Sequence, residues 1–383
     1  MSFAIKYPRR VVIRKILLAI ARVIIKLLTH FEVTGLENIP KTGPLILAGN
    51  HVASLEALLM AAYSPRLVEF LGTGDIPFDS AYAWITKLYG LIPVNRGNLD
   101  REALKKASDV LLQKGVLGIF PEGGIWNPAQ MEAQIGVALI SQRTNAPIIP
   151  IGFGGIRGAL PAALHLKKPK ITMDIGRLIP AVILDQQTGS TKQVLQAAAD
   201  EILKQIDLLI PPAEKQAYKQ YIDHKYELEI SVLGDRGNVD IPADLQVSHG
   251  SAYAHFLYSP VLLDALFRNL ELPILPLMDM HPPMDLVQLR SAWQVILQYL
   301  DNTNSGFFTY RFGMEEGLAV QQALKELTHL LDWVMQNHYS LQLKAVHAYL
   351  DTKSNQQLQQ NGGEFPTSMV KAYQKRNSKK LDR

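Results

Sequence analysis

The chain has 383 residues, of which 48% are hydrophobic, and its formal net charge is +4. This length can bury a full core and predicts two or three domains, while the modest charge points to no nucleic acid partner. Cysteine is absent, which excludes disulfides, thiolate nucleophiles and zinc–cysteine sites and fits a reducing compartment. We predict no metal site and no secretory signal.

Residues 9–30 are the first informative segment, an apolar run that cations interrupt. At about 100° per residue, the basic side chains fall within roughly 160° of arc, namely Arg10, Arg14, Lys15, Arg22 and Lys26. A transmembrane helix needs about 20 consecutive apolar residues, and the charges break the run too often for that. The pattern favours an amphipathic helix in the membrane interface, with residues 1–30 as a membrane-associating segment. The alternative is a helix docked on the protein's own core with a solvated basic edge.

Residues 31–210 alternate short apolar runs with helix-like stretches, which predicts an α/β domain whose mixed sheet is flanked by helices. We expect strands near residues 31–34, 45–48, 68–71, 116–120, 148–151 and 171–175. Helices are expected near residues 55–62, 82–88, 101–113, 132–143 and 191–209. In such sheets ligands bind outside the carboxyl ends of the strands, which is where the unusual residues of this chain fall.

A second region begins where Pro211-Pro212 breaks the chain. We expect residues 211–350 to form a helical accessory domain, with helical stretches at 213–230, 261–269, 286–301 and 317–350. Its histidines show no metal-ligand spacing, and His329 is expected to be packed or exposed rather than a ligand. Residues 351–383 are rich in Gln, Asn, Gly, Ser and Lys and are expected to form a disordered basic tail.

The apolar run 45–48 ends at Gly49-Asn50, presents His51 and then turns into a helix. A histidine takes up a proton near neutral pH, and a carboxylate such as that of Glu56 can fix its tautomer. Five positions on one ideal helix would separate the two residues by about 140°, so contact requires His51 in the turn, with Ser54 as N-cap. In the alternative interpretation, Glu56 only complements the helix dipole and His51 is an ordinary turn histidine.

Three later stretches also carry residues suited to binding. Residues 90–97 include Arg96, whose planar fork of donors suits phosphate or carboxylate. Residues 118–124 read as a strand that ends at Glu122 and is followed by two glycines, whose amides are free to bind an anion. Residues 146–152 read as an apolar strand between prolines, suited to walling a pocket. Taken individually, each stretch is also compatible with a loop that contains a structural glycine.

Together and in this order, the four stretches resemble the sequence blocks of the glycerolipid acyltransferase family, of the lysophosphatidate type, over roughly residues 31–210. That family shows a His followed after four residues by Asp, a block ending in Arg, a Phe-Pro-Glu-Gly block and a proline-rich apolar strand. The resemblance implies that His51 is the general base and that Glu56 orients it. It also implies that Arg96 contacts the acceptor head group and that Glu122, Gly123 and Gly124 shape the acceptor site.

This chain departs from the family's pattern at three places. Glu56 stands where the family has Asp, Gly124-Ile125-Trp126 replaces Thr-Arg-Ser, and Thr73-Gly74-Asp75 stands where relatives often carry Lys. Two of these changes remove positive or hydroxyl groups from the acceptor side, so we expect an acceptor less anionic than lysophosphatidate. The alternative is that Lys87 or Lys105 supplies the missing charge.

The resemblance implies a membrane-associated O-acyltransferase that moves a fatty acyl group from acyl-CoA or acyl-carrier protein to a lysolipid hydroxyl. Transfer should be direct, because the chain has no cysteine and no Gly-x-Ser-x-Gly elbow. We expect no metal or bound cofactor, membrane lipids and the acyl donor as partners, and a peripheral or monotopic place on the cytoplasmic face of a membrane. The alternative is a non-catalytic lipid-binding or scaffolding protein that retains the fold.

Overall fold

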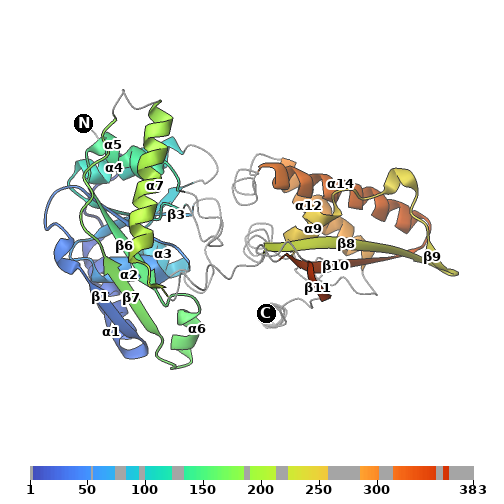
Figure 1. The fold of residues 1–383 in the computed structure, drawn as a ribbon, viewed down its shortest axis with the longest axis horizontal. Helices are drawn as coiled ribbons and strands as arrows, with labels where there is room; N and C mark the ends of the chain where they lie inside the picture. The colour runs from blue at the N-terminus through green and yellow to red at the C-terminus, as the bar shows by residue number, and fades with distance from the viewer. Residues whose placement is uncertain are drawn as a thin grey trace. The chain divides into compact units, whose positions relative to one another are not determined.

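The computed structural model describes residues 3–52, 55–73, 83–94, 100–122, 133–184, 190–212, 223–257, 285–301, 314–350 and 357–361. The described residues up to 212 form one compact unit, and those from 223 onward form a second (Figure 1).

The first unit is built on a seven-stranded sheet with the strand order β1-β7-β6-β2-β5-β3-β4. The central strand β2 (Leu45–Gly49) runs parallel to both neighbours, β5 (Val116–Ile119) and β6 (Ile148–Gly154). Strand β7 runs antiparallel to β6, so the sheet is mixed, as the sequence predicts. The remaining strands are β1 (His30–Thr34), β3 (Val68–Thr73), β4 (Ile92–Val94) and β7 (Lys170–Ile175).

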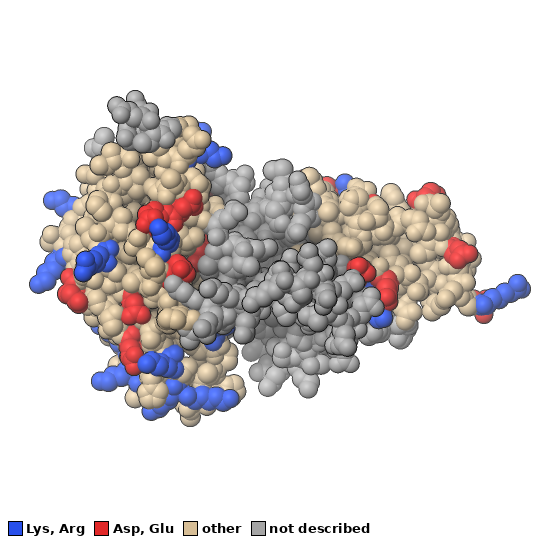
Figure 2. Space-filling model, in the orientation of Figure 1, with Lys and Arg blue, Asp and Glu red and all other residues tan. Residues whose placement is uncertain are grey.

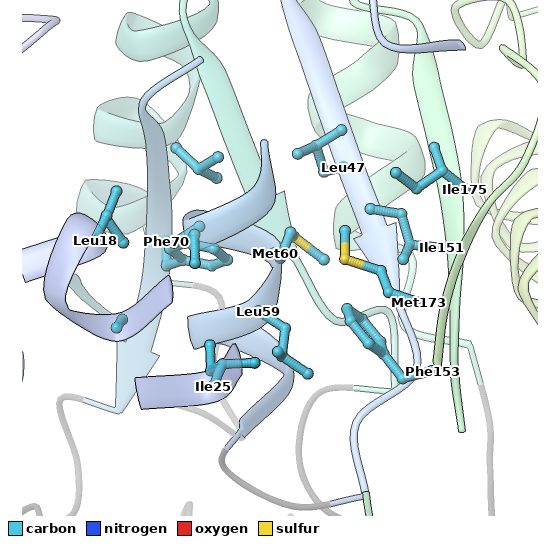
Figure 3. Packing of buried hydrophobic residues seen from close by; sticks show 14 of the residues in the cluster. Leu18, Ile25, Leu47, Leu59, Met60, Phe70, Ile151, Phe153, Met173 and Ile175 are labelled. Atoms are coloured by element: carbon cyan, nitrogen blue, oxygen red, sulfur yellow. The ribbon is translucent and has the colours of Figure 1, made fainter. Parts of the chain in front are cut away.

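Helices cover both faces of this sheet, and alternate residues of β2 point into two different cores. Leu45 and Leu47 pack with helices α1 and α2, whereas Ile46 and Ala48 pack with helices α4, α5 and α7. Figure 3 shows the first of these cores, where Leu18 lies near Phe70 on the inner side of α1. The helices of this unit are α1 (Val11–Leu28), α2 (Leu55–Tyr63), α3 (Ala83–Tyr89), α4 (Arg101–Leu112), α5 (Gly136–Thr144), α6 (Ala159–Leu164) and α7 (Thr191–Leu209), with one 3-10 turn, η1 (Leu36–Asn38).

The predicted α/β class is confirmed. Each of the six expected strands is present, and its first and last residues lie within three residues of the predicted bounds. Helix α7 begins at Thr191 and ends at Leu209, the bounds that its periodicity predicts; its N-terminus carries a capping box between Ser190 and Gln193. Helix α5 begins at Gly136 rather than near residue 132. Strand β4 and helix α6 are too short for a periodic signal and were not predicted as elements.

Helix α1 docks on the first unit through the buried side chains of Arg14, Leu18, Ala21 and Ile25. Its outer side is apolar, with Val12, Ile13, Ile16, Ile20, Val23, Ile24 and Leu27 between 44% and 70% exposed. The predicted basic face is therefore wrong in two of its members. Arg10 precedes the helix in a left-handed conformation, and Arg14 is fully buried. Among the residues that the structure describes, no helix has the length and apolar character to cross a bilayer.

A buried ion pair explains why Arg14 faces inward. Its guanidinium donates to both carboxylate oxygens of Glu69 at 2.5 and 2.7 Å and to the backbone carbonyl of Tyr89 at 2.9 Å. Arg9 donates to the same carboxylate at 2.8 Å. Such a pair is tolerated in a core only when its donors and acceptors are satisfied, as they are here. The pair ties α1 to β3 and to the end of α3.

The second unit combines helices with an antiparallel sheet of order β11-β10-β8-β9. Its helices confirm the predicted helical C-terminal region, and α12 has the predicted bounds. The sheet was not predicted, because residues 223–230 and 340–350 were expected to be helical and are strands. Residues 357–361, expected in a disordered tail, form β11. The predicted helix at 261–269 lies outside the described residues. The elements are β8 (Asp223–Gly234), β9 (Gly237–Val239), η3 (Ala243–Leu245), α9 (Gly250–Leu257), α12 (Leu286–Asp301), α14 (Met314–Gln336), β10 (Ser340–Leu350) and β11 (Gln357–Asn361).

Candidate active site

His51 lies two residues beyond the carboxyl end of β2, beside the carboxyl ends of the parallel strands β5 and β6. The chain leaves β2 in a fixed path because Asn50 is fully buried and pairs with Phe153 in both directions. Its side-chain amide donates to the Phe153 carbonyl at 3.2 Å, and its side-chain oxygen accepts from the Phe153 N–H at 2.7 Å. A Cβ on Gly49 would come within 2.9 Å of the Phe153 ring, so only glycine fits there without a shift.

The carboxylate of Glu56 faces His51 from the first turn of α2. Its side chain is fully buried, and its Oε1 accepts a hydrogen bond of 2.6 Å from the backbone N–H of Val52. Its Oε2 lies 3.8 Å from Nδ1 of His51, a separation longer than a hydrogen bond. Among the described residues, Nδ1 of His51 makes no hydrogen bond. Glu56 therefore both fixes the turn and faces the ring nitrogen that a triad carboxylate would serve.

A second buried carboxyl, Glu122, holds the other side of the turn. Its Oε2 accepts a hydrogen bond of 2.9 Å from the backbone N–H of His51. Burial raises the pKa of Glu122 to about 8; the hydrogen bond from His51 lowers it, and the charge of Glu56 raises it further. At neutral pH this side chain is therefore mostly a neutral carboxylic acid, which avoids placing two negative charges next to one histidine.

The imidazole of His51 is held in place by an aromatic ring. It stacks on Phe120 with ring centroids 4.2 Å apart and an interplanar angle of 16°. The side chain is 20% exposed, so part of the imidazole is accessible to a reactant. Stacking restrains the ring plane, and a restrained ring keeps its nitrogens aimed at fixed points.

A cavity of about 880 Å³ adjoins this site on the α7 side of the sheet. Glu122 forms part of its wall, which joins the cavity to the group that holds the His51 backbone. The other lining residues combine apolar and charged side chains, namely Ala133, Gln134, Ile135, Lys192, Gln196, Asp200, Leu203, Lys204, Ile206, Asp207 and Ile210. Its volume lies within the range of small-molecule sites.

The structure brings three of the predicted site residues together: His51, Glu56 and Glu122. The other three, Arg96, Gly123 and Gly124, lie outside the described residues. Asn50 and Phe120 were not predicted to have a role, although both stand inside the motifs. The only sequence signal for Asn50 is a polar residue between a buried strand and a histidine, and its partner lies 103 positions further along the chain.

The arrangement suits proton transfer. A partly accessible histidine with a buried carboxylate behind it can accept a proton and stabilise the resulting charge. Within the described ranges, no three His, Asp or Glu side chains gather in a way that could hold a metal ion. His329 lies exposed on α14, as expected.

Comparisons with known proteins bear on the first unit. Residues 30–154 match the model of the family described as Acyltransferase. No curated protein gives a match. Among solved structures, the chain is similar to the crystal structure of the 1-acyl-sn-glycerophosphate (LPA) acyltransferase, PlsC, from Thermotoga maritima, with 18% sequence identity and a TM-score of 0.36, over 53% of this chain and 81% of that chain. Residues 30–154 are thus similar to the acyltransferase family, the resemblance that the order of the motifs predicts.

Proposed function

We propose that this protein is a membrane-surface O-acyltransferase that moves a fatty acyl group from acyl-CoA or acyl-carrier protein to the hydroxyl of a lysolipid. The observation that carries the proposal is the position of His51 at the end of the central strand, with Nδ1 facing the buried carboxylate of Glu56. The family match supports acyl transfer, and the motifs support a glycerolipid acceptor.

In the proposed reaction, Nε2 of His51 removes the proton from the acceptor hydroxyl as its oxygen attacks the thioester carbonyl. The carbon–sulfur bond then breaks, and the thiolate leaves with the proton that the imidazolium returns. Glu56 stabilises the imidazolium through Nδ1; the 3.8 Å separation is typical of catalytic contacts that shorten only when substrate binds. The oxyanion requires donors, and we expect backbone N–H groups near the active-site turns to supply them.

Membrane association is proposed from two apolar surfaces of the first unit. Helix α1 exposes seven large apolar side chains on the side opposite its buried stripe, as in helices that lie in a bilayer interface. Helix α6 and its exit expose Leu160, Leu164 and Leu166, followed by Lys167 and Lys168. Lys and Arg gather over this end of the unit (Figure 2). We propose that the protein lies on the cytoplasmic face of the membrane, because a chain without cysteine fits a reducing compartment.

The decisive experiment compares wild type with His51→Ala on labelled acyl-CoA and a mixture of lysolipids. Removal of a general base should lower turnover by about 10²–10⁴ and leave the fold intact by circular dichroism. The same assay without lysolipid measures thioester hydrolysis and separates the non-catalytic alternative. Wild-type protein that binds lysolipid but never consumes thioester would make the chain a lipid-binding protein; equal turnover in wild type and variant would remove His51 as the base.

The acceptor is proposed to be a lysolipid less anionic than lysophosphatidate. The residues that suggest this, Asp75 and Trp126, lie outside the described residues, so the proposal stands on the sequence alone. Competing lysophosphatidate with zwitterionic and neutral lysolipids in one reaction tests it. A preference of more than tenfold in kcat/KM for lysophosphatidate would show that the head group is the ordinary anionic one.

A further inference from the structure

A second, smaller cavity lies at the opposite end of α2 from His51. It has a volume of about 290 Å³ and is lined by Lys15, Leu18, Arg22, Ala61, Ser64, Pro65, Arg66 and Leu67. Three of the eight described lining residues are cationic and none is acidic. At about 30 Å³ for each water, the space equals roughly ten waters, which is enough for a phosphate and part of an attached head group.

The cations of this cavity are positioned by the fold. Arg66 donates to the backbone carbonyls of Pro40, Gly43 and Lys114 at 3.3, 2.7 and 2.6 Å, so its guanidinium is fixed beside the cavity. Burial lowers the pKa of Arg66, and the charge of Tyr7 opposes that change. Arg22 donates through Nε to the carbonyl of Ala62, which holds its stem against the end of α2. The acceptors in these bonds are neutral backbone carbonyls, so the bonds themselves neutralise none of the positive charge of Arg22 and Arg66.

The cavity also borders the exposed apolar side of α1. At about 100° per residue, the buried stripe and the exposed apolar stripe of α1 are centred roughly 150° apart. Lys15, Arg22 and Lys26 lie between them on one side, within about 40° of arc. The nearest large exposed apolar positions around the helix are Val12 and Val23, which are 70% and 59% exposed. A ligand in the cavity would thus have cations around its head and apolar surface beside its mouth.

We propose that the cavity formed by Lys15, Arg22 and Arg66 binds the phosphate of an anionic membrane phospholipid whose acyl chains lie along the apolar side of α1. The inference rests on the membrane association proposed above. A phosphodiester oxygen accepts hydrogen bonds from ammonium and guanidinium groups, and such charge-assisted bonds are stronger than neutral ones. A soluble phosphate would use the cations but not the adjacent apolar surface, so the combination fits a lipid.

The test measures binding of the full chain to vesicles of phosphatidylcholine, with and without phosphatidylglycerol, by co-sedimentation. Lys15→Gln is paired with Lys26→Gln, the same change on the same side of α1 but outside the cavity. We expect Lys15→Gln to weaken binding to the anionic vesicles more than tenfold, as loss of a charged hydrogen bond does. Lys26→Gln should weaken it about fivefold or less, as loss of one surface charge does. At high salt the effect of Lys26→Gln should vanish and that of Lys15→Gln should persist. Thermal unfolding checks that both variants fold.

Each other outcome overturns the inference in a recognisable way. Equal losses in the two variants, or equal binding to both kinds of vesicle, would leave membrane docking but remove the lipid-phosphate site. Binding of inorganic phosphate that depends on Lys15, without discrimination between vesicles, would make this a soluble-phosphate site. Binding to neither vesicle would remove the membrane association as well. Acyl transfer is measured separately in detergent micelles, so its failure leaves the vesicle result readable.

Discussion

Replacing Glu122 with Gln should make the first unit less sensitive to pH. Burial raises the pKa of Glu122 from 4.5 to about 8, so the folded chain holds a proton here that the unfolded chain gives up at much lower pH. This group therefore adds stability below pH 4.5, and that stability is lost as the pH rises through 8. Between pH 5 and pH 9 the loss is on the order of 4 kcal/mol. Gln keeps an oxygen for the His51 N–H but cannot ionise.

The measurement is the free energy of unfolding of the first unit for wild type and Glu122→Gln at pH 5, 7 and 9. Pulse proteolysis in increasing urea, read out on peptides of residues 45–120, follows this unit separately from the second. The difference between the two proteins should shift in favour of the variant as the pH rises, because other titrating groups cancel. Glu122→Ala is the control; it leaves the buried His51 N–H without its acceptor and should cost about 1–3 kcal/mol at every pH. Parallel pH curves for wild type and the Gln variant would refute the reasoning.

Three further predictions concern other charged side chains. Glu56→Gln keeps an acceptor for the neighbouring backbone but cannot offset an imidazolium on His51, so kcat should fall further than in Glu56→Asp; full activity of the Gln variant in the thioester assay would mean that Glu56 only fixes the turn. Arg14→Met leaves the buried carboxylate of Glu69 with Arg9 as its remaining cationic partner among the described residues, and it should destabilise the first unit by up to about 3–5 kcal/mol in urea. Adding Glu69→Gln should recover most of that loss. Burial raises the pKa of Glu326, but hydrogen bonds from residues 248 and 249 outweigh it and lower the pKa from 4.5 to about 2. The second unit should thus lose stability as the pH falls through this range, and Glu326→Gln should weaken that dependence in acid titrations followed by circular dichroism.

The sheet of the first unit was predictable because its strands are continuous apolar runs, the pattern of strands buried on both faces. Helix α1 was predicted as an element, but its orientation was not. Five basic residues on one arc look alike in a sequence. Only the fold places Glu69, 55 positions away, where it draws Arg14 inward. The remaining cations then form a narrow border rather than a face.

One strand of the second sheet has an alternating apolar and polar sequence that could have predicted it. Leu341, Leu343 and Ala345 alternate with polar residues and are all buried, and they pair with Val232, Ile230 and Leu228 of β8. This period of two is typical of a half-buried strand. It follows closely on a long helix, from which residues 337–339, including the left-handed His338, separate it. The helical pattern and the strand pattern therefore read as one apolar stretch, which was predicted as a single helix over residues 317–350.

In the candidate site, too, the residues adjacent to His51 in sequence could be predicted, whereas its contacts with distant residues could not. The strand, the turn and the first helical residues after His51 are adjacent in sequence, and their roles could be predicted. The groups that fix the turn from outside come from β6 and from the end of β5, 103 and 71 positions away. No pattern of spacing connects them to His51. The family resemblance pointed to Glu122 but assigned it to the acceptor, whereas here its carboxyl holds the histidine's own backbone.

Helix α1 docks on the core through one set of residues and exposes another, and the two sets do not overlap. Its outer side chains could therefore be changed without loss of its anchorage. Gln at Val12, Ile16 and Val23 would remove exposed apolar surface from three positions that contribute little to the core, and Gln is a good helix former. We expect such a chain to associate less through this surface, so that the proposed acyl transfer could be assayed in plain buffer. The same substitutions would also suit crystallisation or NMR, because they reduce an exposed apolar surface of a kind that can promote aggregation.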